Sequence, residues 1–167
     1  MIGNRAVLSF TLLAAISACS TAPPKPATTL KQPTNEDDRY CKIDGIFFEE
    51  LAKQRDSQVP KQIAVQQVSA WFRARAMSDE ERKTAASILA RAESTANFVY
   101  ALKPLAPTTM RYFGANVCLM MAAGDRNSEN AVKLAQYAAA CQRQFPPDSA
   151  EQQLRSCITN RAIQLIK

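Results

Sequence analysis

Histidine is absent from the 167 residues of this sequence, and its absence excludes several classes of enzyme mechanism. Neither a Ser-His nor a Cys-His pair is available, and there is no histidine to serve as a general base. The sequence also lacks a Gly-x-Ser-x-Gly elbow, a P-loop and a dinucleotide-binding fingerprint. We therefore expect that the chain is not an enzyme and that it holds neither a cofactor nor a metal ion.

Paired carboxylates are the one acid–base arrangement that the missing histidine leaves open. The candidates are Glu49-Glu50 and Asp79-Glu80-Glu81. The first pair falls on a charged face of an expected helix, and the second group falls in a helix-capping sequence. Ordinary structural roles account for both, so we assign catalysis to neither.

Long apolar runs are also missing near the start of the chain, where a membrane-spanning helix would need about 20 residues. The uncharged stretch from Ala6 to Ile16 follows Arg5 and precedes small residues. This order of charge, apolar run and small residues is typical of a secretory signal peptide, and a buried core helix is the alternative.

Ile16-Ser17-Ala18-Cys19 resembles the bacterial lipobox, in which an aliphatic residue and two small residues precede a modified cysteine. The resemblance implies a diacylglyceryl group on the sulfur of Cys19, cleavage before it, and acylation of the new amino group. Two or more acyl chains anchor a protein stably in a bilayer. Ser20 stands where an Asp would signal retention in the inner membrane, so the resemblance implies the outer membrane, at its periplasmic face.

The sequence divides into a signal peptide (1–18), a lipid-anchored tether (19–35) and a helical periplasmic domain (36–167). The tether, STAPPKPATTLKQPTN after Cys19, contains four prolines and four threonines. Proline-rich linkers extend by about 3.1 Å per residue, so this segment spaces the domain from the bilayer.

Glycine is scarce, with four residues, and no segment alternates as a strand would. Apolar residues recur instead every three or four positions, so we expect an all-α fold, a single compact bundle of five or six helices. The segments RDSQVP and VYALKPLAP are similar to those of small exported helical proteins of Gram-negative bacteria, a resemblance that implies no activity. The first three expected helices run from about Asp37 to Ser57, from Pro60 as the first helical position past Arg75, and from a capping box at Ser78 to just before Pro104. The other three run from Pro107 to a left-handed cap at Gly124, from a cap at Ser128 to Phe145, and from a cap formed by Asp148 with Glu151 past Leu165.

Four cysteines remain when Cys19 is set aside, and an even number in an oxidising compartment indicates two disulfides. Three pairings are open to Cys41, Cys118, Cys141 and Cys157. A zinc site is the weaker alternative, because the sequence has neither histidine nor a Cys-x-x-Cys pair. We predict Cys141–Cys157, because the Pro146-Pro147 turn folds consecutive helices back on each other, and Cys41–Cys118, which ties the first helix to the fourth.

The net charge of +6, reduced to +5 when the signal peptide is removed with Arg5, is spread along the chain. No basic patch is interleaved with aromatics, so we expect no nucleic-acid partner. Two sets of residues could form a binding surface, although the first pattern more often marks a solvated helix face and the second a core. They are the basic stretch Arg73, Arg75, Arg82, Lys83 and Arg91, and the apolar set Trp71, Phe72, Met110, Phe113, Met120 and Met121.

The C-terminal residue, Lys167, is similar in that one position to the major murein lipoprotein, which ends in a lysine joined to peptidoglycan. The helix dipole alone also favours a lysine there, and we prefer that interpretation to a peptidoglycan contact. The leading hypothesis is a lipoprotein whose domain binds an envelope protein or scaffolds an envelope assembly. The alternative is a periplasmic inhibitor or immunity protein that neutralises a toxic enzyme.

Overall fold

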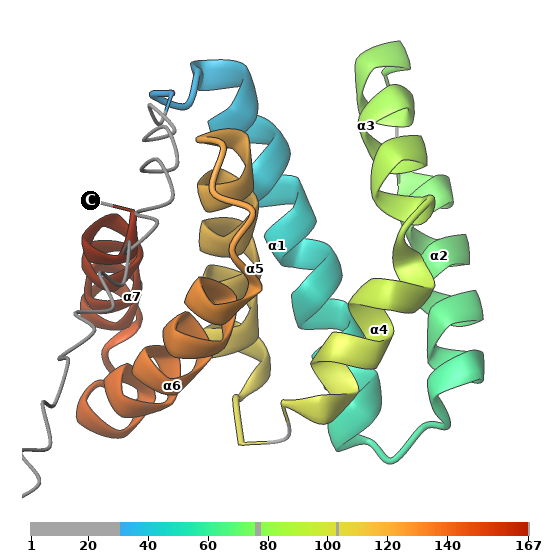
Figure 1. Cartoon of the computed structure of the whole chain (residues 1–167). Coiled ribbons are helices and arrows are strands. Elements are labelled where there is room, and N and C mark those ends of the chain that lie inside the picture. Colours follow the sequence, from blue (N-terminus) through green and yellow to red (C-terminus); the bar gives the residue numbers. More distant parts are fainter. Residues whose placement is uncertain (1–30, 76–77, 103, 167) are drawn as a thin grey trace, which may run out of the picture.

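Seven helices make up the computed structural model, which describes residues 31–75, 78–102 and 104–166 (Figure 1). These residues contain no strand, so the predicted all-α class is confirmed. The predicted signal peptide, most of the predicted tether, Cys19 and Lys167 lie outside the described residues. The helices are α1 (Asn35–Asp56), α2 (Lys61–Arg75), α3 (Asp79–Leu89), α4 (Ala92–Ala101), α5 (Pro107–Ala122), α6 (Ser128–Gln144) and α7 (Glu151–Leu165).

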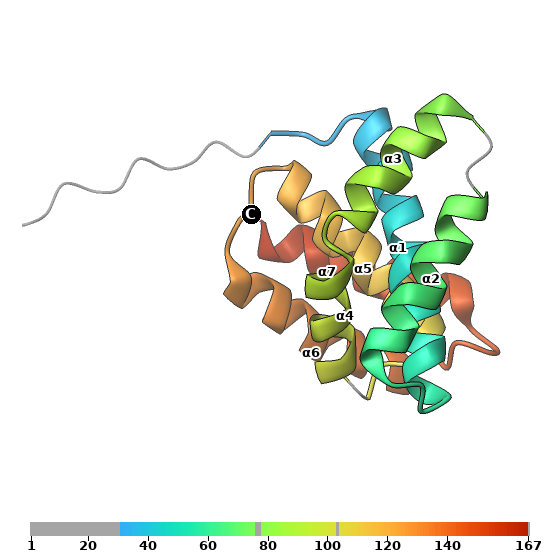
Figure 2. The same cartoon turned by 90° about the vertical axis from the view of Figure 1, so that its right-hand side faces the viewer.

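The helix expected between Ser78 and Pro104 is in fact two helices, which brings the count among the described residues to seven rather than five or six. Arg91 has φ −119° and ψ 17°, outside the helical region, and its N–H bonds to the carbonyl of Ile88 at 3.2 Å. The Arg91 side chain forms an ion pair with Asp44 of α1, with 2.9 Å between Nη2 and Oδ1. The chain therefore bends between α3 and α4, and the two form an arm beside α2 (Figure 2).

Two of the predicted helix ends are confirmed in detail. Ser78 and Glu81 form a reciprocal capping box at the start of α3. Gly124 follows α5 with φ +95°, and the amide of Asp125 reaches back to the carbonyl of Met120 at 2.9 Å. This is the Schellman arrangement that a left-handed glycine allows.

Three predicted helix starts or caps were wrong by one or two residues. Pro60 precedes the first residue of α2 rather than occupying it, and its carbonyl accepts the first helical bond, from Ala64. Asn127, not Ser128, caps α6, because its side chain accepts from the amide of Glu129. Asp148 does not cap α7, which begins after Ala150 without a side-chain cap.

The closest helix pair, α1 with α5, is built on two glycines and a disulfide. A Cβ on Gly45 would lie 2.5 Å from the carbonyl oxygen of Arg111, so only glycine permits this approach. Gly114 faces the ring of Phe48 in the same way. The Cys41–Cys118 disulfide closes the same interface, with its Cα atoms 5.3 Å apart.

The second disulfide, Cys141–Cys157, joins α6 to α7 with Cα atoms 5.9 Å apart, so both predicted pairings are present in the structure. Pro146 stops α6, and the amides of Ser149 and Ala150 both bond to its carbonyl. This compact turn reverses the chain, so that the two cysteines meet although they lie at different distances from the turn.

A buried arginine, Arg55, joins the end of α1 to the end of α4. Its guanidinium donates to the carbonyls of Val99 (3.1 Å), Leu102 (2.8 Å) and Leu105 (2.6 Å). Asp56 supplies the counter-charge at 2.7 Å. The last carbonyls of a helix lack partners within it, so this single side chain caps α4 and fixes the following loop against α1.

Candidate functional site

A groove runs along the outside of the fold, between α2 and the arm made by α3 and α4. It consists of three adjoining hollows of about 480, 600 and 430 Å³. The first two share Arg73, Leu89 and Ala90, and the last two share Val65, Glu93 and Asn97, which makes them continuous. We call this feature the interhelical groove. Its other lining residues are Lys61, Gln62, Gln66 and Ser69 from α2, and Arg82, Ala85, Ala86, Arg91, Ala92 and Ser94 from the arm.

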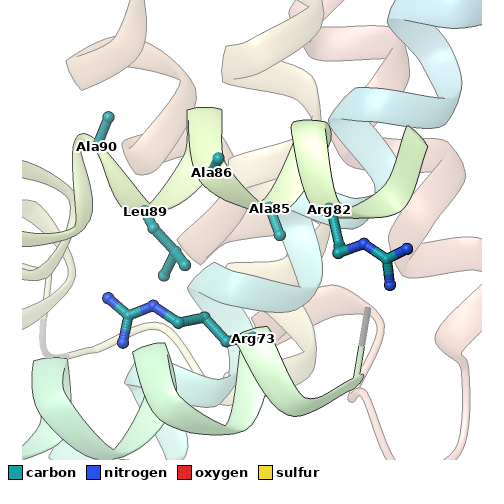
Figure 3. A pocket seen from close by; sticks show the side chains of 6 residues that line it. All are labelled: Arg73, Arg82, Ala85, Ala86, Leu89 and Ala90. Carbon is teal, nitrogen blue, oxygen red and sulfur yellow. The ribbon is translucent and has the colours of Figure 1, made fainter. Parts of the chain in front are cut away.

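The groove exists because α2 turns bulky residues inward while the arm offers small ones along its edge. Phe72 and Val68 of α2 are buried in the core. On α3, the small residues Ala85 and Ala86 line the hollow and fill little of the space between α3 and α2. Leu89 of the same helix is half-buried and forms an apolar floor (Figure 3). A channel with an apolar base therefore remains open between the helices.

Arg73 is an exposed cation of this channel. Its side chain extends from α2 along the groove beneath Leu89, whereas Arg82 stands on α3, with its head pointing away from that of Arg73 (Figure 3). Arg82 pairs with Asp79 at 2.5 Å. No residue in the described ranges forms an ion pair or hydrogen bond with Arg73. Arg73 is therefore available to a ligand without first breaking a contact within the domain.

Arg91 is a second cation of the groove, held from behind by a buried carboxylate. Asp44 of α1 lies 2.9 Å from Arg91, and its side chain is only 2% exposed, against 34% for that of Arg91. Burial raises the pKa of the Asp44 carboxyl above its usual value, and the nearby guanidinium opposes that shift. The hydroxyl of Tyr40 accepts a further bond from Arg91 at 3.1 Å and lies 3.2 Å from the hydroxyl of Ser87. These contacts fix the guanidinium at the groove wall.

The other end of the groove carries charge of both signs. Lys61 donates to the side-chain oxygen of Asn97 at 2.5 Å, which bridges α2 and α4. Glu93, exposed nearby, is the one acidic residue among the described lining residues. The groove therefore offers several cations and an apolar floor, a combination that suits binding.

The predicted basic stretch divides in space. Arg73, Arg82 and Arg91 line the groove. Arg75 instead lies over the ring of Trp71, 5.1 Å from its centroid, and Lys83 is exposed outside the lining set. The helical fold thus selects three of the five cations for one surface.

Most of the apolar candidates are buried in the core, as is usual for apolar residues at helical spacing. The members that are buried are Phe72, Met110, Phe113 and Met120. Trp71 and Met121 are the exceptions, with 37% and 54% of their surface exposed. Neither lines the interhelical groove.

The candidate carboxylates occupy the positions of structural ion pairs. Glu49 lies 3.2 Å from Lys53 and 3.7 Å from Arg111, and Glu50 lies 2.7 Å from the same lysine. At the other candidate, Glu81 closes the capping box, while Asp79 and Glu80 pair with Arg82 and Arg39. The two groups lie on different helices, α1 and α3.

Two buried charged residues, Asp44 and Arg55, were missed by the sequence reasoning. Asp44 falls within the apolar stripe of α1 between Tyr40 and Phe47. A charge in such a stripe needs a partner from another element, because an unpaired buried charge is very costly. This rule would have predicted from the sequence that Asp44 is buried and paired. Arg55 lies at the end of its helix, where no neighbouring pattern predicts its burial.

A larger hollow of about 720 Å³ lies along α7. Except for Phe145, its walls come from one polar face of that helix, including Gln152, Asn160 and Gln164. Polar residues along one side of a surface helix are the ordinary solvated face. The interhelical groove, with walls from separate helices and an apolar floor, is the better candidate site.

The chain matches no family model, no curated protein and no solved structure. Within the described ranges, no three Cys, Asp or Glu side chains come together as a metal site would require. None of the described helices combines the length and the apolar character needed to cross a membrane.

Proposed function

We propose that this chain is an outer-membrane lipoprotein, anchored through acylated Cys19, whose helical periplasmic domain binds a protein partner in the interhelical groove. The observation that carries the binding function is Arg73, an arginine with no partner in the described chain, whose side chain lies next to the apolar floor at Leu89. Arginine and apolar groups are characteristic of the central parts of protein interfaces. An open channel between helices suits a peptide segment better than a small molecule, which is usually enclosed.

The anchor rests on the lipobox sequence and on the length of chain before the first described contact. The backbone amide of Lys31 donates to the carbonyl of Ala123 at 2.9 Å, so the chain joins the helical body at the end of α5. Lys31 lies twelve residues after Cys19, a stretch that would span about 37 Å at the polyproline II rise of 3.1 Å per residue. The domain would therefore remain close to the membrane and meet partners at the envelope surface.

The anchor is tested by replacing Cys19 with serine in the full chain expressed in a Gram-negative host. We expect the natural chain to yield a mature N-terminal peptide that carries acyl chains and to fractionate with the outer membrane. The C19S variant should remain uncleaved or leave that fraction. An unchanged mass and location for the variant would refute the anchor and leave the groove untouched.

The partner is tested by affinity capture from crosslinked envelopes. Ala86→Arg places a long side chain in the groove, and Gln136→Arg adds the same charge on the exposed face of α6. We expect a stoichiometric partner with the natural chain and with Q136R, and its loss with A86R. Equal capture by both variants would refute the groove as the binding surface. A captured toxic enzyme whose activity falls on binding would favour the inhibitor hypothesis over the scaffold.

A further inference from the structure

Resting on the proposed function, we infer that the interhelical groove takes an acidic segment of the partner protein, with carboxylates at Arg73 and Arg91 and an aliphatic side chain on the floor at Leu89. The electrostatic balance of the groove carries this inference. Among the described residues, its lining contains Lys61 and the arginines at 73, 82 and 91, against Glu93 as the single acid. Charge complementarity of this kind selects partners and accelerates association.

The cations of the groove differ in whether they already have a partner within the domain. Arg82 has Asp79, and Lys61 bonds to the neutral amide of Asn97. Arg73 has no partner among the described residues. A carboxylate of the occupant would supply one, and arginine binds carboxylates with two parallel hydrogen bonds.

Arg91 is prepared for binding in a different way. Its counter-ion, Asp44, lies behind it in the core, and its remaining exposed surface faces the middle hollow. Because the guanidinium is already fixed by Asp44 and Tyr40, little side-chain entropy would be lost when an occupant binds. Arg73 lines both this hollow and the next one, so a single segment passes both arginines.

The dimensions of the groove set the length of that segment. From Lys61 to Arg73, α2 advances about 18 Å at 1.5 Å per residue. About five or six extended residues cover that distance at 3.3 Å each, or about twelve residues of helix. Glu93 lies toward the Lys61 end, so the occupant's carboxylates gather at the opposite end, near Arg73.

The probe is a library of random 12-residue peptides displayed on phage, selected on the full acylated chain in neutral detergent. We expect the selected peptides to be rich in Asp and Glu with interspersed aliphatic residues. A synthetic peptide from this set should lose about tenfold in affinity when Arg73 is changed to Gln, and a similar factor when its own acids become amides. The matched control Arg143→Gln, an exposed arginine of α6, should leave the affinity unchanged.

The possible outcomes separate this inference from the proposed function. Neutral or basic peptides whose binding is blocked by Ala86→Arg would overturn the acidic occupant while the groove remains a binding site. Acidic peptides that lose equal affinity with R73Q and R143Q would show unspecific charge attraction and would overturn the inference. If no selected peptide depends on the groove, both the inference and the proposed binding surface are wrong.

Discussion

Gly114 of α5 lies against the ring of Phe48 of α1, so closely that a Cβ on Gly114 would fall 2.5 Å from Cγ of that ring. Gly45 of α1 meets the backbone carbonyl of Arg111 at the same interface. Cβ of Phe48 would also lie only 2.9 Å away, so the whole Phe48 side chain would have to shift, whereas at Gly45 the obstacle is a backbone carbonyl within a helix. The two glycines therefore set how closely α1 and α5 pack, and they differ in how much a larger residue costs.

Gly114→Ala and Gly45→Ala should both destabilise the domain, and Gly45→Ala should do so more. Overpacking costs about 1–3 kcal/mol, and alanine regains up to about 1 kcal/mol through its helix propensity. We expect a net loss of about 1–2 kcal/mol for G114A in urea denaturation. The control Gln136→Ala on the exposed face of α6 should change stability little. Unfolding midpoints equal to that of the natural chain would contradict the close packing.

Arg55→Met should be among the most damaging single substitutions in the described chain. Methionine fills part of the volume but takes from the Leu105 carbonyl the donor that it has now. The carbonyls of Val99 and Leu102 each lose one bond but keep a backbone bond, at 3.2 and 3.3 Å. An unsatisfied buried polar group costs about 1–3 kcal/mol, and the two lost charge-assisted bonds add to this cost. We expect a loss of at least about 2 kcal/mol, measured by denaturant unfolding. Arg143→Met, at an exposed site, is the control, and equal losses would contradict the buried role of Arg55.

The two disulfides should contribute unequally to stability. The Cys41–Cys118 bond spans 77 residues of sequence and the Cys141–Cys157 bond spans 16. The loop-closure model gives about 4.5 kcal/mol for the long loop and about 3 kcal/mol for the short one. Replacing the first pair with alanines should therefore lower the free energy of unfolding more than replacing the second. The reverse order would show that chain entropy does not dominate here.

Asp44→Asn should make stability less dependent on pH. Burial raises the pKa of the Asp44 carboxyl, so the folded state binds its proton more tightly than the unfolded state does. The stabilisation that the protonated Asp44 carboxyl contributes is therefore complete below its pKa in the unfolded chain. It is lost as the pH rises through its higher pKa in the folded chain. The stability of the natural chain relative to D44N should fall as the pH is raised from about 3.5 to 7. A difference that grows with pH would reverse the sign and show that the Arg91 pair outweighs burial.

The sequence predicted the helical class and most helix positions because those depend on local features. Apolar periodicity and the caps at Ser78 and Gly124 are written in neighbouring residues. The break at Arg91 was not predicted, and the carboxylate that pairs with Arg91 there, Asp44, lies 47 residues away in the sequence. The intervening alanines favour helix, so nothing local indicates a bend.

The candidate site was predictable in its residue types but not in its assembly. The basic stretch named Arg73, Arg82 and Arg91, yet Arg75 in the same run lies on Trp71 instead. Which cations share a surface depends on how the arm folds against α2. Lys61 joins them from the far end of α2, too distant in sequence to belong to the same run.

Site-specific photo-crosslinking in intact cells tests the central claim most directly, because it asks whether the anchored chain holds a partner in the interhelical groove. A photoreactive amino acid is placed at Ala86, inside the groove, or at Gln136, on the exposed face of α6. The account predicts one discrete membrane-associated product from position 86 that disappears when Arg73 is also changed to Glu, and no such product from position 136. Equal crosslinking from both positions, or none from position 86, would contradict it.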